Sequence, residues 1–126
     1  MAHDLAIRGG TLATATDTFI ADIGIRNGRI VTISEAITDA KDVIDATNHI
    51  VMPGGIETHC HIAQESGMGV MTSDDYASGS ISAAFGGNSC FVPFAAQATG
   101  KSLAETMRLY DERAVSKSVL DWSYHL

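Results

Sequence analysis

Hydrophobic and polar residues alternate along the first part of the chain, with short turn signals between the runs. Residues 19–25 place Phe19, Ile23 and Ile25 at alternate positions, the pattern of a half-buried strand. Asn27-Gly28 supplies two residues that tolerate positive φ, as a tight hairpin turn requires, and 30–33 forms the return strand. The pattern also predicts a fainter second pair of strands, 43–44 with 50–52.

The pattern changes at Pro53-Gly54-Gly55, where strands begin to alternate with helices. Residues 56–62 are predicted to form a strand. A helix is predicted between the N-capping residues 72–75 and Gly86-Gly87. This alternation is typical of parallel strands joined by crossover helices. We therefore expect two domains, 1–52 and 53–126.

The rest of the chain continues the same alternation. A short strand is predicted at 90–94. Ser102 and Glu105 then form a capping box at the start of a helix. The spacing predicts that this helix buries Leu103, Met107, Tyr110 and Ala114. A third apolar strand is predicted at 119–126.

An apolar strand at the end of the chain needs a covering helix and neighbouring strands. A closed eight-stranded α/β barrel takes about 250 residues, and 74 residues follow Met52. We therefore expect an α/β fold in which 53–126 forms the first two to three βα units of a (β/α)8 barrel and is incomplete as given. The alternative is an open three-stranded α/β sheet that is complete as it stands.

Composition narrows the class of protein. The chain has 126 residues and a formal net charge of −7, which argues against binding to nucleic acid or to an anionic membrane surface. It has no long apolar run and no basic, apolar leader, so a cytoplasmic protein is expected. Cys60 and Cys90 are therefore expected to be reduced thiols, with a disulfide as the alternative.

The candidate chemistry lies in the predicted strand at 56–62. Because side chains alternate along a strand, Glu57, His59 and His61 are expected on one face, with Thr58 and Cys60 on the other. Two imidazoles on one face can bind a divalent metal such as Zn²⁺. By itself a His-x-His spacing is weak, and two hydrogen-bonded structural histidines are the alternative.

Several further segments strengthen the metal-binding interpretation of the two histidines. Taken in their order along the chain, they resemble the amidohydrolase superfamily and, within it, the dihydropyrimidinase and D-hydantoinase branch of cyclic amidases. The similarity begins in the first strand and the hairpin. It continues through the histidine motif, the first helix with its glycine stop, and the last strand. The segments are 4–10, 21–30, 51–61, 74–80 with 83–87, and 121–125.

The resemblance implies a fold and an activity. Residues 1–52 would be the N-terminal part of a small β-sandwich domain, followed by a TIM-like barrel. The full-length protein would be a hydrolase acting on carbon–nitrogen bonds other than peptide bonds. It would open a dihydropyrimidine or hydantoin ring to an N-carbamoyl amino acid. A small cyclic amide would be its substrate, and a homo-tetramer is expected.

The resemblance also implies a centre with two Zn²⁺ ions, in which His59 and His61 bind the more buried ion. The metals would activate a bridging hydroxide and polarise the ring carbonyl. The remaining ligands of the family are a carboxylated lysine, two histidines and an aspartate, at positions later than the printed sequence. None of Lys41, Lys101 and Lys117 matches the lysine position.

Glu57 departs from the family, which usually has aspartate there. The extra methylene moves the carboxylate by about 1 to 1.5 Å, enough to change a hydrogen bond that orients a metal-binding imidazole. The alternative is that Glu57 makes the same contact through another rotamer.

The loop 64–71 follows the histidine strand at the face where barrel active sites form. By resemblance, Met68, Val70 and Met71 are expected to contact the exocyclic group of the substrate. The alternative is a mobile loop whose methionines pack on a neighbouring subunit.

Other polar residues receive structural interpretations. Cys60 is expected to face away from the two histidines, and His125 to be a buried hydrogen-bonding residue. His3 and His49 are expected at the surface. The acids at helix starts, Asp74, Asp75 and Glu105, are expected to stabilise those helices.

Three other functions remain open. An allantoinase or dihydroorotase shares the histidine motif but usually follows it with an arginine-bearing loop, and 64–71 contains no arginine. A non-catalytic dihydropyrimidinase-related protein keeps the fold without the metal ligands. A small metal-binding module would have two histidines where Zn²⁺ normally has three or four protein ligands. The 126-residue segment alone is expected to be catalytically silent.

Overall fold

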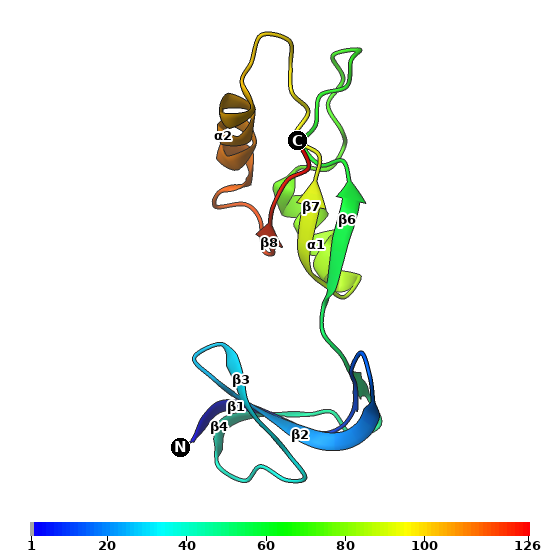
Figure 1. Cartoon of the computed structure of the whole chain (residues 1–126), viewed down its shortest axis with the longest axis vertical. Coiled ribbons are helices and arrows are strands. Elements are labelled where there is room, and N and C mark those ends of the chain that lie inside the picture. The colour runs from blue at the N-terminus through cyan, green and yellow to red at the C-terminus, as the bar shows by residue number, and fades with distance from the viewer. Residues whose placement is uncertain (1) are drawn as a thin grey trace. The chain divides into compact units, whose positions relative to one another are not determined.

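The computed structural model describes residues 2–126 and divides into two compact units, Met1–Pro53 and Gly54–Leu126. The first unit is an all-β unit, and the second contains both helices of the described residues (Figure 1). The strands of the first unit are β1 (His3–Ala13), β2 (Thr18–Arg26), β3 (Arg29–Ser34), β4 (Ala40–Asp45) and β5 (Ile50–Val51).

The predicted hairpin is confirmed as β2 and β3. The two strands are antiparallel, and Ile23 is paired with Ile33. Both turn residues adopt positive φ, 52° at Asn27 and 71° at Gly28. These values match the tight turn that the Asn-Gly sequence favours.

The predicted pairing of the second two strands is wrong. β4 and β5 do not pair with each other; each pairs in parallel with β1, where Leu5 lies opposite Asp42 and Thr11 opposite Ile50. β1 spans 11 residues, so one edge of it accommodates both short strands in succession. The Asp45 carboxylate shapes the turn between them by accepting hydrogen bonds from the backbone and hydroxyl of Thr47.

The second unit is a parallel three-stranded sheet with two helices, as the alternation predicts. Its elements are β6 (Gly55–Cys60), α1 (Tyr76–Phe85), β7 (Asn88–Pro93), α2 (Leu103–Ala114) and β8 (Asp121–Trp122), and the sheet order is β6-β7-β8. β8 is shorter than predicted, although a bridge between Phe94 and His125 continues its alignment. Within the described residues, neither helix has the length and hydropathy that a membrane crossing requires.

The start of α1 follows the sequence. Asp75 is the N-cap, and its carboxylate accepts hydrogen bonds from the backbone N–H groups of Ala77 and Ser78. The bond from Ser78 is the largest of the contacts that hold the pKa of Asp75 below its usual range. Gly86 caps the other end, as predicted, and Gly87 follows with a φ of 84°.

The buried face of α2 differs in part from the prediction. Ser102 caps the helix as expected, and Tyr110 and Ala114 are buried. Leu103 and Met107, however, are 51% and 39% exposed, and Thr106 is buried instead. Thr106 tolerates burial because its hydroxyl donates to the Ser102 carbonyl within the helix, at 3.0 Å.

One apolar cluster joins both helices to the same face of the sheet. Its members come from the end of β6, from α1, β7 and α2: Ile62, Ala63, Tyr76, Phe91, Ala95, Tyr110 and Ala114. Asp111 of α2 reinforces this packing by accepting hydrogen bonds from Trp122 Nε1 at 3.3 Å and Tyr124 Oη at 2.9 Å. The opposite face of the sheet is left without a helix (Figure 1).

Ser80 gives a direct test of how α1 is tied to the segment before β8. Its fully buried hydroxyl accepts from the Val119 backbone N–H at 3.0 Å and donates to the Ala77 carbonyl. Ser80→Ala leaves the Val119 N–H unpaired, so the free energy of unfolding should fall by about 1 to 3 kcal/mol in chemical denaturation. Ser82→Ala, on the exposed side of α1, is the matched control and should change it by less than about 0.5 kcal/mol. Equal effects of the two substitutions would contradict this assignment.

Candidate metal site

His59 and His61 lie at the carboxyl end of β6, on the sheet face that carries no helix. Their ring centroids are 5.7 Å apart, and both side chains are exposed. The structure thus brings together the two imidazoles that the His-x-His spacing singles out. In a parallel α/β sheet, the carboxyl ends of the strands are where ligands bind.

A β-bulge in β6 decides which side chains share this face. Glu57 pairs with Phe91, and Cys60 pairs with Pro93. Between these two pairs β6 advances by three residues and β7 by two, so β6 contains one extra residue. Phe91 and Pro93 are fully buried on the helix side. Glu57 and Cys60 therefore both lie on that side. A cavity of about 270 Å³ beside α1 is lined by both and, where β6 ends, also by His61. The expectation that Glu57 shares a face with the histidines is wrong, because a bulge interrupts the alternation.

Side chains satisfy the backbone groups of the bulge. The Glu57 carboxylate accepts a hydrogen bond from the His59 backbone N–H at 2.8 Å, and the Thr58 carbonyl lies 2.7 Å from His125 Nε2. Glu57 thus contacts the main chain of His59, not its imidazole. His125 makes the expected hydrogen bond, but it is exposed in this structure and not buried.

Phe94, which follows β7, packs against both candidate ligands. Its ring stacks on His61 with a centroid distance of 4.9 Å and an interplanar angle of 10°. It meets the edge of the His59 ring at 4.9 Å. Sequence reasoning missed this contact. The available signal was the predicted parallel alignment of the two strands, which brings their carboxyl ends together.

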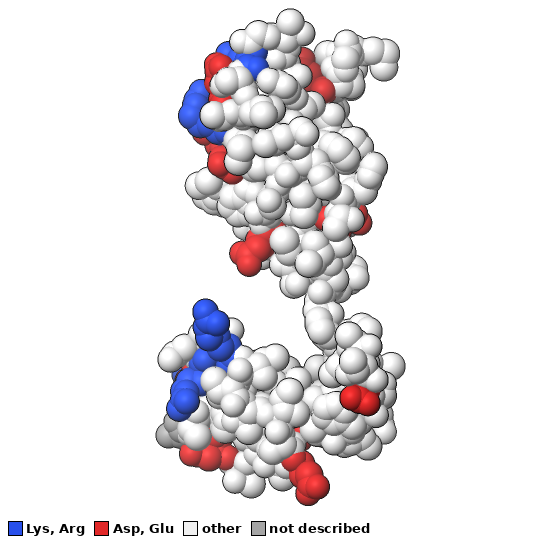
Figure 2. Space-filling view, viewed as in Figure 1, with Lys and Arg blue, Asp and Glu red and all other residues white. Residues whose placement is uncertain are grey.

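Charged side chains are sparse around this face. Figure 2 shows a largely uncharged surface over β7, with acidic side chains at its edges, whereas Lys and Arg side chains of the same unit gather over α2. Of the latter, Lys101 and Arg108 are each paired with a glutamate one helical turn later, at Glu105 and Glu112. The Glu57 carboxylate, which accepts from the His59 backbone N–H, is a charged group close to the two imidazoles.

The donor atoms fit part of a metal site. The Gln64 side-chain oxygen lies 2.7 Å from His61 Nδ1, which leaves Nε2 of that ring available as a ligand. Among residues 2–126, no group of three or more His, Cys, Asp or Glu side chains is arranged to hold a metal. The described residues thus bring together two candidate nitrogen donors, His59 and His61.

The loop after β6 projects its apolar side chains into solvent. The exposed fractions are 88% for Met68, 61% for Val70 and 48% for Met71. A bridge between Glu65 and Met71 and a hydrogen bond from the Ser66 N–H to the Val70 carbonyl close the base of the loop. Three exposed apolar side chains therefore stand on a closed loop that follows the histidine strand.

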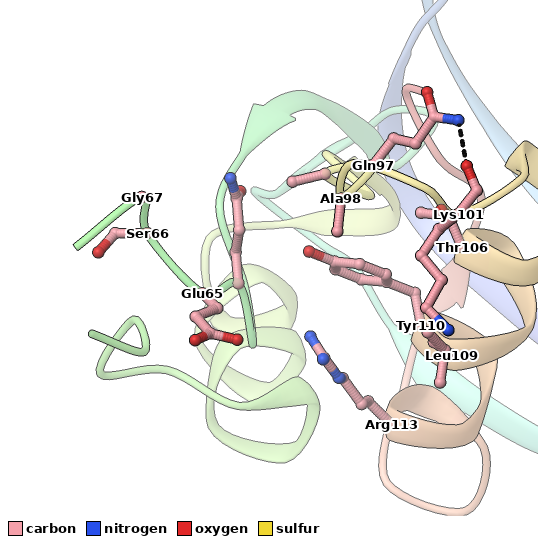
Figure 3. Close-up of a pocket in the computed structure, with 12 residues that line it drawn as sticks. Glu65, Ser66, Gly67, Gln97, Ala98, Lys101, Thr106, Leu109, Tyr110 and Arg113 are labelled. Atoms are coloured by element: carbon pink, nitrogen blue, oxygen red, sulfur yellow. Dashed lines mark hydrogen bonds between the residues drawn. The ribbon is translucent and has the colours of Figure 1, made fainter. Parts of the chain in front are cut away.

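A cavity of about 570 Å³ lies between this loop and α2. Figure 3 shows Tyr110 and Arg113 of α2 on one side of it and Glu65 of the loop on the other. Arg113 donates to the Ala63 carbonyl at 2.6 Å, and its guanidinium lies 4.6 Å from the Tyr110 ring centroid. The arginine thus ties α2 to the chain segment that leaves β6.

Both cysteines are free thiols, as expected. Cys60 packs against the apolar cluster under the helices. Burial first, and the Glu57 charge second, raise the pKa of Cys60 from 9.0 to about 11. At neutral pH the side chain is therefore an uncharged thiol, which is a poor metal ligand.

Comparisons of sequence and of structure both find D-hydantoinases and dihydropyrimidinases similar to this chain. The chain is 39% identical over 121 residues to a D-hydantoinase of Geobacillus stearothermophilus, and 36% identical over 124 residues to a dihydropyrimidinase of Arabidopsis thaliana. These alignments cover 95% and 97% of the chain. The crystal structure of a dihydropyrimidinase from Brevibacillus agri matches 96% of the chain with a TM-score of 0.90 and 41% identity.

The relatives are much longer than this chain. The chain spans 26% of the Geobacillus protein, 23% of the Arabidopsis protein and 26% of the Brevibacillus structure. It therefore covers about a quarter of the length of the proteins it matches. No protein-family model matches the chain.

The raised pKa of Cys60 has a measurable consequence. At pH 8, iodoacetamide should alkylate Cys60 of the native protein about a hundredfold more slowly than an ordinary thiol, because the higher pKa lowers the thiolate fraction. Mass spectrometry of the peptide that contains Cys60 follows the reaction. Unfolding in urea is the control and should restore the ordinary rate. Equal rates in native and unfolded protein would contradict the burial of this thiol.

Proposed function

Because the chain is homologous over nearly its whole length to D-hydantoinases and dihydropyrimidinases, we propose that the full-length protein hydrolyses a carbon–nitrogen bond of a cyclic amide. The reaction would open a hydantoin or dihydropyrimidine ring to an N-carbamoyl amino acid. The observation that carries this proposal is the pair of imidazoles, His59 and His61, at the carboxyl end of β6. A binding protein that holds no metal has no need of two histidines side by side there.

The proposal assigns a role to each unit. Residues 1–52 form part of a β-sandwich domain, and 53–126 form the first βα units of a (β/α)8 barrel. Two observations support this assignment: the parallel order β6-β7-β8 and the sheet face that no helix covers. In the barrel, that face points inward, where β-barrel side chains fill the interior and ligands enter at the carboxyl ends of the strands. A homo-tetramer of the full-length protein belongs to the same proposal.

His59 and His61 would hold one of two divalent metal ions, Zn²⁺ by the chemistry of the donors. When bound, such ions lower the pKa of water and polarise a carbonyl group, which is the chemistry that amide hydrolysis requires. The protein residues orient the donors. Phe94 stacks against the His61 ring, and Glu57 holds the His59 main chain. Lysine, histidine and aspartate ligands would come from the rest of the full-length protein.

The other functions are less well supported. The relatives reported above are named for hydantoin and dihydropyrimidine hydrolysis, and the loop 64–71 has no arginine for the charged substrate of a dihydroorotase or allantoinase. A non-catalytic relative has no use for metal ligands, and both histidines are present and adjacent. We therefore favour the cyclic amidase.

The loop after β6 would select the substrate. Met68, Val70 and Met71 are exposed apolar side chains on a loop closed at its base by the Glu65–Met71 bridge. They stand at the carboxyl end of β6, the same end as the histidines. Contact with the exocyclic group of the substrate would bury them, which is favourable for apolar side chains.

Removal of either imidazole tests the proposed metal site. In the full-length protein, His59→Ala and His61→Ala should each lower the hydrolysis rate of hydantoin or dihydrouracil by about 100-fold or more, with loss of bound zinc. His49→Ala, in the other unit, is the matched control and should leave both quantities unchanged. Zinc content by elemental analysis and a ring-opening assay are the measurements. Full zinc content and full rate in both variants would contradict the proposal.

Truncation of the loop side chains tests their role in selection. Met68→Ala with Met71→Ala should change the ratio of kcat/KM between a hydantoin with a bulky exocyclic group and unsubstituted hydantoin by about 10-fold or more, since each lost apolar contact is worth about 1 to 3 kcal/mol. Met107→Ala, at a half-exposed position of α2, is the control. An unchanged ratio in the loop variant would instead support packing against a neighbouring subunit.

A further inference from the structure

We propose that Gln64 is a positioning residue, which fixes the tautomer and the ring orientation of His61 for metal binding. The inference rests on the proposed function, because it assigns to one side chain a task in the metal site. It concerns a residue of the loop base that the histidine motif itself does not include. Its support is the hydrogen bond between the Gln64 side-chain oxygen and His61 Nδ1, at 2.7 Å.

The chemistry of this hydrogen bond decides which ring nitrogen carries a proton. An amide oxygen can only accept a hydrogen bond, so Nδ1 of His61 carries the proton. In the neutral imidazole the lone pair then lies on Nε2, the nitrogen at the far side of the ring. With its amide oxygen facing Nδ1, Gln64 favours the tautomer in which Nε2 is the free metal donor. A histidine without such a partner divides its population between both tautomers.

Phe94 and Gln64 restrict the His61 ring from different directions. The Phe94 ring stacks on it at an interplanar angle of 10°, which restrains the tilt of the imidazole plane. The hydrogen bond from Nδ1 to Gln64 restrains rotation of the ring within that plane. Together the two contacts fix the direction in which the Nε2 lone pair points.

Gln64 is itself held in place, as a positioning residue must be. Its backbone N–H donates to Thr72 Oγ1 at 3.1 Å, and its carbonyl accepts from the Thr72 N–H at 2.9 Å. Thr72 lies at the far end of the loop, just before α1. The two bonds close the loop around Gln64, so its side chain starts from an anchored backbone and is half-buried.

Among residues 2–126, no side chain makes an equivalent hydrogen bond to the ring of His59. Its backbone N–H is held by Glu57, and its ring makes edge contacts with Phe94 and His61. The Gln64 contact therefore distinguishes the two candidate ligands: His61 is the one prepared in advance for the metal. Partners of this kind are worth about 10- to 100-fold in metal affinity.

The test compares three variants of the full-length protein by zinc affinity, measured by competition with a chelator. Gln64→Leu removes the acceptor and should weaken zinc binding about 10- to 100-fold. Gln64→Glu keeps an acceptor oxygen and should retain wild-type affinity or exceed it. Gln97→Leu makes the same chemical change on the neighbouring loop, where the Gln97 side chain donates to the Lys101 carbonyl, and should have no effect.

The thermal midpoint of the metal-free protein separates positioning from a general effect on folding. It should be the same for the Gln64→Leu and Gln64→Glu variants. Wild-type zinc affinity in Gln64→Leu would overturn the inference and leave the proposed function standing. An equal loss of affinity in both Gln64 variants would also overturn it, because rescue by the retained acceptor would have failed. A wild-type protein that binds no zinc would contradict the proposed function itself.

Discussion

The bulge in β6 is the constraint on which the candidate site depends. Between Glu57 and Cys60 the strand gains one residue relative to β7, so Cys60 packs into the apolar cluster under the helices while His59 and His61 lie on the opposite face. A bulge leaves backbone groups outside the ladder, and they need other partners. Glu57 and His125 provide them, one from each face of the sheet. Residues that look like candidates for chemistry therefore serve first to hold the backbone that aims the imidazoles.

The features that the sequence predicts well are those decided by neighbouring residues. The Asn27-Gly28 turn requires only the φ preferences of two residues, and the Asp75 and Ser102 caps require only backbone N–H groups two or three positions away. The parallel order of β6, β7 and β8 follows from the same kind of information, since helices between strands impose crossovers. The closeness of His59 and His61 belongs to this class as well.

The features that the sequence misses depend on residues far apart in the chain. β4 and β5 have the composition of paired strands, but the long edge of β1 offers each a better partner. The buried face of α2 is set by what it meets on the sheet, so Thr106 replaces the more apolar Leu103 and Met107. Glu57 changes face because of a register shift between two strands, and Phe94 reaches the histidines only when those strands are aligned. Periodicity contains none of this information.

The central claim is that one divalent metal ion joins His59 and His61 on the open face of the sheet. The most direct measurement is a crystal structure of the zinc-loaded full-length protein with anomalous scattering recorded at the zinc absorption edge. We expect an anomalous peak about 2.0 to 2.1 Å from Nε2 of His61 and from a ring nitrogen of His59. A zinc-loaded protein whose anomalous peaks all lie away from these two imidazoles would contradict the claim.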